Sequence, residues 1–297
     1  MNIRDLEYIV AIADEKSFIK ASQLCFVSQP ALSMQVKKLE DQLGVVLFER
    51  QHKSILLTEA GKIIVNKARV ILQSVNDLKL VAKSYHQPLK GVLKFGLFPT
   101  IAQYILPDLL EVLQNNFSDM QLHPVEEKTP LIEAQLKEGQ LDCALLAAPV
   151  DEQIFKFIPL FDDYLVTAVP KGHPLTKLNQ ITLKDLVEEP LLLLEEGHCL
   201  RTQALEFCAQ SEHPFNIDRT TTSLESLRHM VASGLGVTVI PEVAIKYSPY
   251  QSDKIHYIPF KEPKPYRKVG LVFRKSHPNY ILHNTLSEKL ITHFNDK

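Results

Sequence analysis

Apolar and polar positions in the first 57 residues alternate with the spacing of three short helices followed by a two-stranded ribbon. Asp5 lies in the first turn of the first helix, where a carboxylate interacts favourably with the positive end of the helix dipole. These intervals predict two amphipathic helices before residue 25. Their apolar positions are Leu6, Ile9, Val10 and Ala13 in the first helix and Phe18, Ala21 and Leu24 in the second.

The segment that follows carries the signals of a third helix with defined ends. Ser28 is a natural N-cap, Pro30 is tolerated in the first helical turn, and Gly44 closes the C-terminal end. Residues 45–58 then show the alternation and the central charge cluster of a two-stranded wing. The predicted buried stripe of the third helix is Leu32, Val36, Leu39 and Leu43.

A second face of this helix, about a hundred degrees from the buried stripe, repeats polar residues every four positions. A solvated helix face would carry the same residue types. Two short helices joined by a tight connection nevertheless favour a helix-turn-helix, whose second helix enters the major groove of DNA. There Gln pairs with adenine, Lys reaches guanine and Ser serves either base edge, while a wing meets phosphates or the minor groove. The residues expected to contact DNA are Ser28, Gln29, Pro30, Ser33, Gln35 and Lys37 in the helix and Arg50, His52 and Lys53 in the wing.

Residues 58–87 carry an apolar repeat in alternating steps of four and three, the pattern of a coiled-coil seam about three heptads long. An amphipathic helix packed on its own domain is the alternative. The regular repeat, the exposed lysines and the position between two modules favour a dimerising linker helix, which would place two reading heads on a near-palindromic DNA target. The seam positions are Ile64, Ala68, Ile71, Val75, Leu78, Ala82 and Tyr85, and the exposed lysines are Lys62, Lys67, Lys79 and Lys83.

From residue 88 to the end of the chain, short β-rich runs alternate with helical segments. This alternation implies an α/β architecture with largely parallel sheets and sites at the strand ends. Because about 205 residues is long for one sheet, residues 88–297 are expected to form two subdomains with a cleft. The runs predicted to be strands are 92–98, 120–127, 142–148, 164–170, 190–196, 236–241, 254–260 and 268–273. The chain is thus predicted to have three parts, the winged helix-turn-helix of residues 1–57, the linker helix of residues 58–87 and a regulatory domain of residues 88–297.

The composition of the 297-residue chain is that of an ordinary soluble globular protein, with 45% hydrophobic and 23% charged residues. No secretory signal is visible and no apolar run is long enough to span a bilayer, so a cytoplasmic protein with no membrane contact is expected. Residues 1–90 carry 13 Lys and Arg against 9 Asp and Glu, a net +4, and the remainder carries 20 against 26, a net −6. A basic front on an acidic body favours a nucleic-acid-binding module fused to another domain.

Four cysteines, Cys25, Cys143, Cys199 and Cys208, are expected to be thiols in that compartment. Cys199 follows His198 and opens a helical segment, where partial positive charge stabilises a thiolate. A peroxide-reactive cysteine needs this environment, because the thiolate is the nucleophile and a sulfenic acid is its first oxidation product. No CxxC pair and no suitably spaced His/Cys set accompanies these residues, so no metal site and no cofactor are predicted.

The run SQPALSMQVKKLEDQLGVVLFER, followed by LTEAGK, resembles the N-terminal signature of the LysR-type transcriptional regulators, and the similarity continues to the C-terminus. The runs EEGHCLRTQALEFC, FGLFPTI and SLESLRHMVASGLGVTVIP resemble those of the peroxide-sensing members. The resemblance implies an effector region folded like the type 2 periplasmic binding proteins. Its first subdomain would be built from residues 91–162 and 269–297, and its second from residues 163–268.

The resemblance also implies a redox role for one cysteine pair, Cys199 and Cys208, through a reversible disulfide. In an intact helix these residues would lie roughly 13 Å apart along the axis. A disulfide needs Cα atoms within roughly 7 Å, so the bridge would require the helix to unwind. Two unrelated buried thiols are the alternative. Cys25 and Cys143 are interpreted as buried thiols without a redox role.

Four further residues match positions that support peroxide chemistry in the family. By resemblance, Thr100 and Thr129 would orient peroxide or a water molecule, His198 would donate or relay a proton, and Arg267 would support the charged state. For each threonine, a role as a strand-end cap is the alternative.

The favoured hypothesis is an activator of oxidative-stress genes, not an enzyme, that binds double-stranded DNA and takes hydrogen peroxide as its signal. RNA polymerase is an expected partner, and the resemblance implies a homodimer or homotetramer. The second hypothesis is a metabolite-responsive regulator of the same architecture, with passive cysteines and a small molecule in the cleft. The third is a thiol peroxidase, which leaves the helix-turn-helix and the linker helix without a role.

Overall fold

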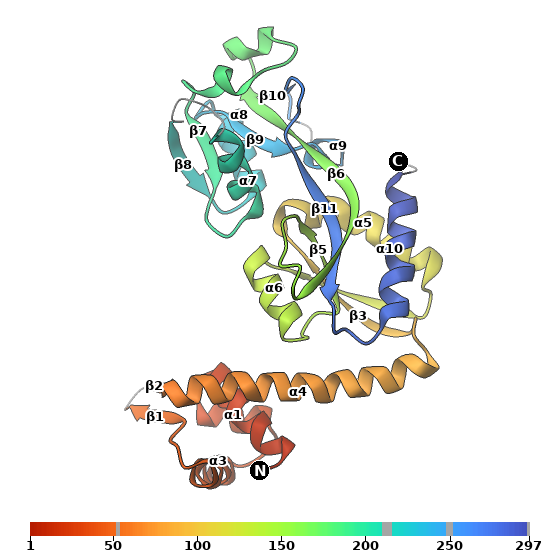
Figure 1. The fold of residues 1–297 in the computed structure, drawn as a ribbon. Helices are drawn as coiled ribbons and strands as arrows, with labels where there is room; N and C mark the ends of the chain where they lie inside the picture. Colours follow the sequence, from red (N-terminus) through yellow and green to blue (C-terminus); the bar gives the residue numbers. More distant parts are fainter. Residues whose placement is uncertain (52–53, 210–215, 248–251, 296–297) are drawn as a thin grey trace. The chain divides into compact units, whose positions relative to one another are not determined.

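The computed structural model describes residues 1–51, 54–209, 216–247 and 252–295, and the chain divides into two compact units, Met1–His86 and Gln87–Lys297 (Figure 1). Each unit has its own hydrophobic core. No helix within these ranges is both long enough and apolar enough to cross a membrane. The N-terminal unit consists of α1 (Ile3–Glu15), α2 (Phe18–Leu24), α3 (Gln29–Leu43), β1 (Phe48–Gln51), β2 (Ser54–Leu57) and α4 (Glu59–His86).

The third helix has the ends that the sequence predicts. The N–H of Ala31 donates to Oγ of Ser28 at 3.4 Å, and Gly44 ends the helix in the left-handed conformation with a φ of +69°. Three of its four predicted stripe residues, Leu32, Val36 and Leu39, are buried. The prediction is wrong for Leu43, which is 38% exposed because it lies in the last turn, and equally for Leu24 at the end of α2, which is 60% exposed.

The N-terminal half of α4 packs on α1 instead of presenting the predicted seam. Val65 and Ala68 are buried in the core that α1, α2 and α3 form, and Leu72 packs against its edge. A continuous heptad seam is therefore the wrong prediction for this half, where the alternative of a helix packed on its own domain holds. On the exposed side of the helix, Ile71 is 44% exposed and Leu78 is 70% exposed. These side chains leave apolar surface for contact with another chain. The side chains of Lys83 and Tyr85 lie outside the described residues.

The C-terminal unit has the predicted α/β class, with a seven-stranded sheet in the order β10-β6-β11-β5-β3-β4 and β9 pairing with β6 as well. A separate two-stranded sheet joins β7 to β8. The strands are β3 (Gly91–Leu97), β4 (Met120–Glu126), β5 (Cys143–Ala147), β6 (Phe155–Pro170), β7 (Leu191–Leu194), β8 (Ile217–Thr221), β9 (Thr238–Pro241), β10 (Ile255–Pro259) and β11 (Tyr266–Arg274). The helices are α5 (Pro99–Asn116), α6 (Thr129–Lys137), α7 (Cys199–Cys208), α8 (Leu224–Ala232), α9 (Val243–Lys246) and α10 (Tyr280–Asn295), with 3-10 turns η1 (Pro174–Lys177) and η2 (Leu183–Leu186).

Two long strands, β6 and β11, connect two lobes of this unit (Figure 1). The first lobe contains β3, β4, β5, α5, α6 and α10, and the second lobe contains β7, β8, β9, β10, α7 and α8. β6 pairs with β11 over residues 155–164 and then with β9 and β10 over residues 165–170. The expectation of largely parallel sheets is wrong. The described pairs β3–β4, β3–β5 and β7–β8 are parallel, but those that involve β6 or β11 are antiparallel. The reason is that the chain leaves the first lobe along β6 and returns to it along β11.

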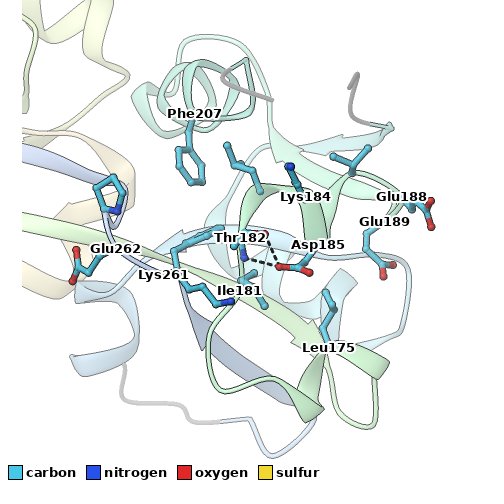
Figure 2. Close-up of a pocket in the computed structure, with 14 residues that line it drawn as sticks. Leu175, Ile181, Thr182, Lys184, Asp185, Glu188, Glu189, Phe207, Lys261 and Glu262 are labelled. Atoms are coloured by element: carbon cyan, nitrogen blue, oxygen red, sulfur yellow. Dashed lines mark hydrogen bonds between the residues drawn. The ribbon is translucent and has the colours of Figure 1, made fainter. Parts of the chain in front are cut away.

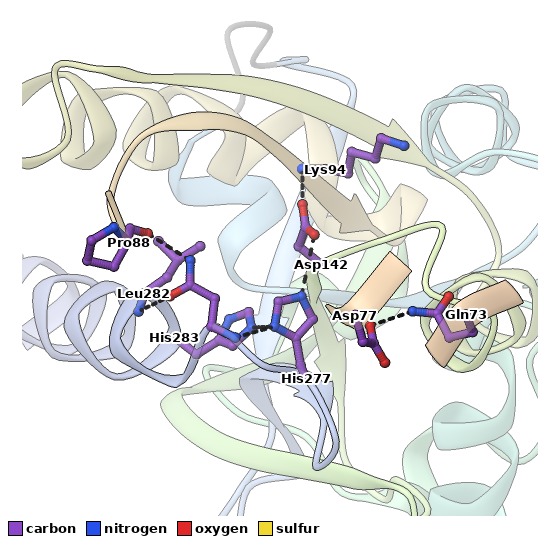
Figure 3. A network of polar contacts seen from close by, with 9 residues as sticks. Gln73, Asp77, Pro88, Lys94, Asp142, His277, Leu282 and His283 are labelled. Carbon is purple, nitrogen blue, oxygen red and sulfur yellow. Dashed lines mark hydrogen bonds and ion pairs between the residues drawn. The ribbon is translucent and has the colours of Figure 1, made fainter. Parts of the chain in front are cut away.

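A buried pair of histidines lies where α10 meets the first lobe (Figure 3). Nε2 of His283 is 2.9 Å from Nδ1 of His277, and Nε2 of His277 is 3.4 Å from Oδ1 of Asp142. The N–H of Asn279 donates to the same Nδ1 of His277 at 3.2 Å, so this nitrogen acts as an acceptor and His283 supplies the proton of the bond between the rings. Asn279 in turn donates to the carbonyl of Pro88 at 2.7 Å. The network therefore fixes Nδ1 of His277 as an acceptor and Nε2 of His283 as a donor, while Nδ1 of His283 has no partner among the described residues.

We expect this network to make the chain less stable in mild acid. Burial, followed by His277 and Arg274, holds the pKa of His283 well below its ordinary value. An unfolded histidine titrates near pH 6.5, so unfolding takes up a proton below that pH. Above about pH 6.5 this histidine costs the folded chain no stability. Below that pH the free energy of unfolding falls by up to about 1.4 kcal/mol per pH unit.

Urea unfolding between pH 7.5 and 5 measures this loss. His283→Phe keeps a ring stacked on Phe273, 4.2 Å away in the parent, and should flatten the pH dependence. His256→Phe, at an exposed position, is the control and should leave the slope unchanged. An equal slope in His283→Phe and the parent would show that the buried pair does not set the acid sensitivity.

Candidate redox site and DNA-reading helix

Cys199 is the first residue of α7, and Cys208 is the last. The Cys199 side chain is half-buried, so it is accessible from one side and lies at the positive end of the helix dipole. His198 is the N-cap residue and makes no side-chain cap hydrogen bond. The start of the helix is where the sequence places it, and all ten residues from Cys199 to Cys208 are helical.

Cys208 lies in an environment opposite to that of Cys199. Its side chain is packed in the core of the second lobe, and burial raises the pKa of its thiol to about 11. The thiolate is the reactive form of a cysteine, so Cys208 is inert at neutral pH while α7 is intact. Both thiols are free, as are Cys25 and Cys143, but the interpretation of Cys25 as a buried thiol is wrong, because its side chain lies at the edge of the core and is only partly buried. Burial raises the pKa of Cys143 well above its ordinary value, in agreement with its interpretation as a core thiol.

Lys128 ties the start of α6 to the loop that precedes Cys199. Its ammonium forms an ion pair with Glu195 and donates to the carbonyl of Glu196 at 3.2 Å. Gly197, with a φ of +90°, lies so close that an added Cβ would come within 2.9 Å of Cδ of Lys128. Thr129, the next residue after Lys128, is thereby held near the loop that carries Cys199.

Several buried polar atoms around this loop have no hydrogen-bond partner among the described residues. They are Oγ1 of Thr129, Oε1 of Gln203 and both ring nitrogens of His198, although the Thr222 backbone lies beside that ring. Burial, followed by the Lys128 ammonium, lowers the pKa of His198, so its imidazole is neutral at pH 7. Unsatisfied donors and acceptors in a buried site are costly unless a small polar molecule completes them.

Arg267 and Thr100 belong to a second buried cluster. Nη1 of Arg267 donates to Oγ1 of Thr100 at 2.8 Å and Nη2 donates to the Thr100 carbonyl at 3.2 Å. Asp163 balances the guanidinium, with its Oδ2 accepting from Nε at 2.9 Å. The Asp163 carboxylate also accepts from the N–H of Val243 at 3.1 Å. Since Thr100 accepts from Arg267, its own hydroxyl proton remains available to a molecule beside it.

The predicted residues thus fall into two clusters, and no hydrogen bond among the described residues joins one to the other. Thr100 and Arg267 are joined by a hydrogen bond. Thr129 and His198 are connected only indirectly, because Lys128, which precedes Thr129, contacts Glu195 and Glu196 in the loop before His198. Neither threonine is a strand-end cap, because each lies in the first turn of a helix. Sequence reasoning missed Asp163, Lys128, Glu195 and Gln203. Gln203, four residues after Cys199, was detectable from helical spacing, and Lys128 from its place beside Thr129.

The residues of α3 that the sequence predicts to contact DNA lie on the side away from the core. Gln29, Pro30 and Lys37 are exposed, and Ser33 and Gln35 are partly exposed. The connection from α2 to α3 is short, and Phe26 within it has a left-handed φ of 56°. Of the wing residues, His52 and Lys53 lie outside the described residues, as does the side chain of Arg50.

A winged helix-turn-helix that continues into a long helix, followed by a two-lobed α/β domain, defines a DNA-binding transcription regulator with a separate sensing domain. The chain belongs to the LysR family of such regulators, which are not enzymes. The model of the bacterial regulatory helix-turn-helix protein of the lysR family matches residues 3–62, and that of the LysR substrate binding domain matches residues 86–293.

Relatives with assigned names are similar over almost the whole chain. The DNA-binding transcriptional dual regulator OxyR of Escherichia coli K12 is 40% identical, over 98% of this chain and 95% of its own. The structure of full-length OxyR from Pseudomonas aeruginosa, a cysteine-to-aspartate variant, is 37% identical with a TM-score of 0.78, covering 98% of this chain and 94% of its own. A cysteine-to-serine mutant of Corynebacterium glutamicum OxyR with hydrogen peroxide bound is 29% identical with a TM-score of 0.67, covering 99% and 93%.

Proposed function

We propose that this chain is a transcriptional activator that senses hydrogen peroxide through Cys199 and stores the signal as a reversible Cys199–Cys208 disulfide. The single observation that carries the proposal is the setting of Cys199 at a helix N-terminus, near the ring nitrogens of His198 and Oγ1 of Thr129, which are buried and have no hydrogen-bond partner among the described residues. Relatives named as hydrogen peroxide-inducible genes activators, and the peroxide-bound relative, give further support.

In the first step the Cys199 thiolate attacks one oxygen of hydrogen peroxide and the O–O bond breaks. Cys199 becomes a sulfenic acid, and the leaving hydroxide takes a proton and departs as water. In this proposal the neutral imidazole of His198 and the hydroxyl of Thr129 donate to that developing charge, and Thr100, which accepts a hydrogen bond from Arg267, holds the peroxide.

In the second step the Cys208 thiolate attacks the sulfenic sulfur, a disulfide forms and a second water leaves. The two Cα atoms are nine helical steps apart, about 13 Å along the axis, against the roughly 7 Å that a disulfide tolerates. Helix α7 must therefore unwind. Unwinding also takes Cys208 out of the core, which removes the burial that holds its pKa at about 11 and makes its thiolate available. The chemistry and the change of conformation are thus one event.

Unwinding has to break a defined set of contacts that hold α7 in place. Phe207 packs edge-to-face on Phe260 with ring centroids 4.9 Å apart, and Nη1 of Arg201 donates to the Leu194 carbonyl at 2.9 Å. Leu200 and Ala204 are buried on the same helix. These contacts set how readily the oxidised helix opens.

Phe207→Ala is expected to speed disulfide formation. An aromatic pair is worth about 0.5–1.5 kcal/mol beyond the area it buries, so its loss should accelerate the second step about 2- to 12-fold. Trapping free thiols at intervals after saturating peroxide measures that step. Phe294→Ala removes a similar pair with Phe161, at 4.7 Å and away from α7, and is the matched control. An unchanged or slower step in Phe207→Ala would show that opening of α7 does not limit the reaction.

To change DNA binding, oxidation has to alter how the chains of the oligomer pack together. In this proposal exposed apolar residues of α4, among them Ile71 and Leu78, pair two chains, and effector domains pair in addition to give a tetramer on a near-palindromic operator. Repacking of the second lobe then changes the spacing of the reading heads and the contact with RNA polymerase. The same proposal divides the regulatory domain at residues 162 and 269, close to where β6 and β11 pass between the lobes.

A metabolite-responsive regulator is the second candidate, because the second lobe contains a cavity of about 890 Å³. Figure 2 shows Phe207 from α7 facing this cavity from one side and the η2 turn with Lys184 and Asp185 from another. A ligand here would contact the same helix that carries the cysteines. In that case the cysteines would be passive and peroxide would leave DNA binding unchanged.

The function is tested by selecting bound fragments from genomic DNA with the reduced and the peroxide-treated chain. We expect near-palindromic sites whose protection pattern changes on oxidation, both in the parent and in the control Cys143→Ser. The same pattern before and after oxidation is expected for Cys208→Ser. If the parent gives identical protection in both states, the chain does not transmit a peroxide signal to DNA.

A further inference from the structure

A mixed set of metal-ligating side chains lies between α5 and α10 in the first lobe, apart from the redox site. Asp108 and Glu111 come from α5 and His293 from the last turn of α10. One ligand atom from each lies within 4.8 Å of the other two. The two helices pack against each other, so their contact fixes this arrangement (Figure 1).

The spacing of the two acids places them on one face of α5. Residues three apart are neighbours on a helix surface, so Asp108 and Glu111 point to the same side. Nε2 of His293 is 2.9 Å from Oδ1 of Asp108. Around a first-row divalent cation with metal–ligand bonds of about 2.1 Å, adjacent ligand atoms lie about 3.0–3.4 Å apart. The first two ligand atoms are therefore already at nearly the separation that coordination requires.

Burial and charge fit a cation as well. Asp108 is 3% exposed, His293 is partly buried and Glu111 is exposed, so the set is closed on the protein side and open to water on the other. Two carboxylates carry a charge of −2, which a divalent cation neutralises. The last turn of α10, where His293 lies, is the negative end of its helix dipole and favours positive charge.

We propose that Asp108, Glu111 and His293 bind a first-row divalent transition-metal ion, with water in the remaining positions. Two carboxylate oxygens and one imidazole nitrogen are a ligand set that such ions accept without a thiolate. Nε2 would coordinate through its lone pair, so the proton that it now shares with Asp108 moves to Nδ1 and the imidazole stays neutral. The bound ion would clamp α10 to α5.

Cobalt(II) is the probe, because its spectrum distinguishes this site from the cysteines. The full-length reduced chain, freed of metal with a chelator, is titrated with cobalt chloride. We expect one equivalent to bind, with weak ligand-field bands and without the intense sulfur-to-cobalt charge-transfer band that binding to Cys199 or Cys208 would give. A charge-transfer band at the first equivalent would overturn the proposal.

Three ligand variants, Asp108→Asn, Glu111→Gln and His293→Gln, should each weaken cobalt binding by at least about tenfold. Glu111 is exposed, so Glu111→Gln tests the site without risk to folding. Glu152→Gln and His229→Gln, at exposed positions elsewhere, are the matched controls and should bind as the parent does. Binding that is absent from the parent, or equally tight in Glu111→Gln and the parent, would show that these residues do not form a metal site.

Discussion

A Cys199→Ser variant is expected to form no disulfide on peroxide treatment and to react with peroxide at least about a hundredfold more slowly than the parent chain. The other thiols lack the environment of Cys199. Burial raises the pKa of Cys143, Cys208 and Cys25, which leaves little thiolate at neutral pH. Cys199 lies at the N-terminus of α7, near buried polar atoms of His198 and Thr129 for which the described part of the chain supplies no hydrogen-bond partner. Serine keeps the size of the side chain and removes the nucleophile.

Two further variants separate the two steps of the reaction. Cys208→Ser should still consume one equivalent of peroxide and stop at the sulfenic acid, which a dimedone adduct detects by mass. Cys143→Ser should behave as the parent does. Peroxide consumption that Cys199→Ser leaves unchanged would mean that another group is the nucleophile.

An Arg267→Leu variant is expected to lose about 3–5 kcal/mol of unfolding free energy, because it leaves the Asp163 carboxylate buried without its cation. The guanidinium is 0% exposed and the carboxylate 2% exposed, so water cannot replace the lost ion pair. The same change removes the donor that orients Thr100, so peroxide reactivity of Cys199 should fall with it.

Urea unfolding monitored by circular dichroism measures the loss, and two comparisons locate its cause. Lys268→Leu, at the exposed neighbouring position on β11, should cost little. Arg267→Leu combined with Asp163→Leu should recover most of the stability, since removing both charges avoids the unpaired one. If the double variant is no more stable than Arg267→Leu, packing of the guanidinium, not its charge, is what the site requires.

Local signals in the sequence predict local structure well in this chain. Ser28 and Gly44 mark the two ends of α3, and the first residue of α7 follows from its position after Gly197 and His198. These features depend on neighbouring residues, because a cap acts within one turn of the helix.

Features that depend on distant partners were not predictable. The apolar residues of α4 do follow a heptad repeat, yet two of its seam positions face the core of the N-terminal unit: Ala68 is buried there and Ile64 packs against it. The first half of β6 lacks a clear alternation, and its pairing with β11 shifts register there between Val269 and Gly270. Arg267 and Asp163 are 104 positions apart in the sequence, and the pairing of β6 with β11 brings them into hydrogen-bond contact.

The edge strand β8, with the sequence IDRTT, illustrates the same limit. Its residues are mostly polar and carry no hydrophobic run, so the strand exists through pairing with the buried β7. Sequence resemblance proposed Thr100, Thr129 and Arg267 as candidates, but the two clusters in which they lie follow from helix ends and strand pairing.

The most direct test of the redox mechanism is disulfide mapping of the full chain by mass spectrometry after one equivalent of hydrogen peroxide, with free thiols alkylated before digestion. We predict a Cys199–Cys208 linked peptide, with Cys25 and Cys143 alkylated, and return of all four alkylated thiols after reduction. A peroxide-treated chain in which Cys199 and Cys208 remain alkylated, or are each joined to other cysteines, would contradict the mechanism.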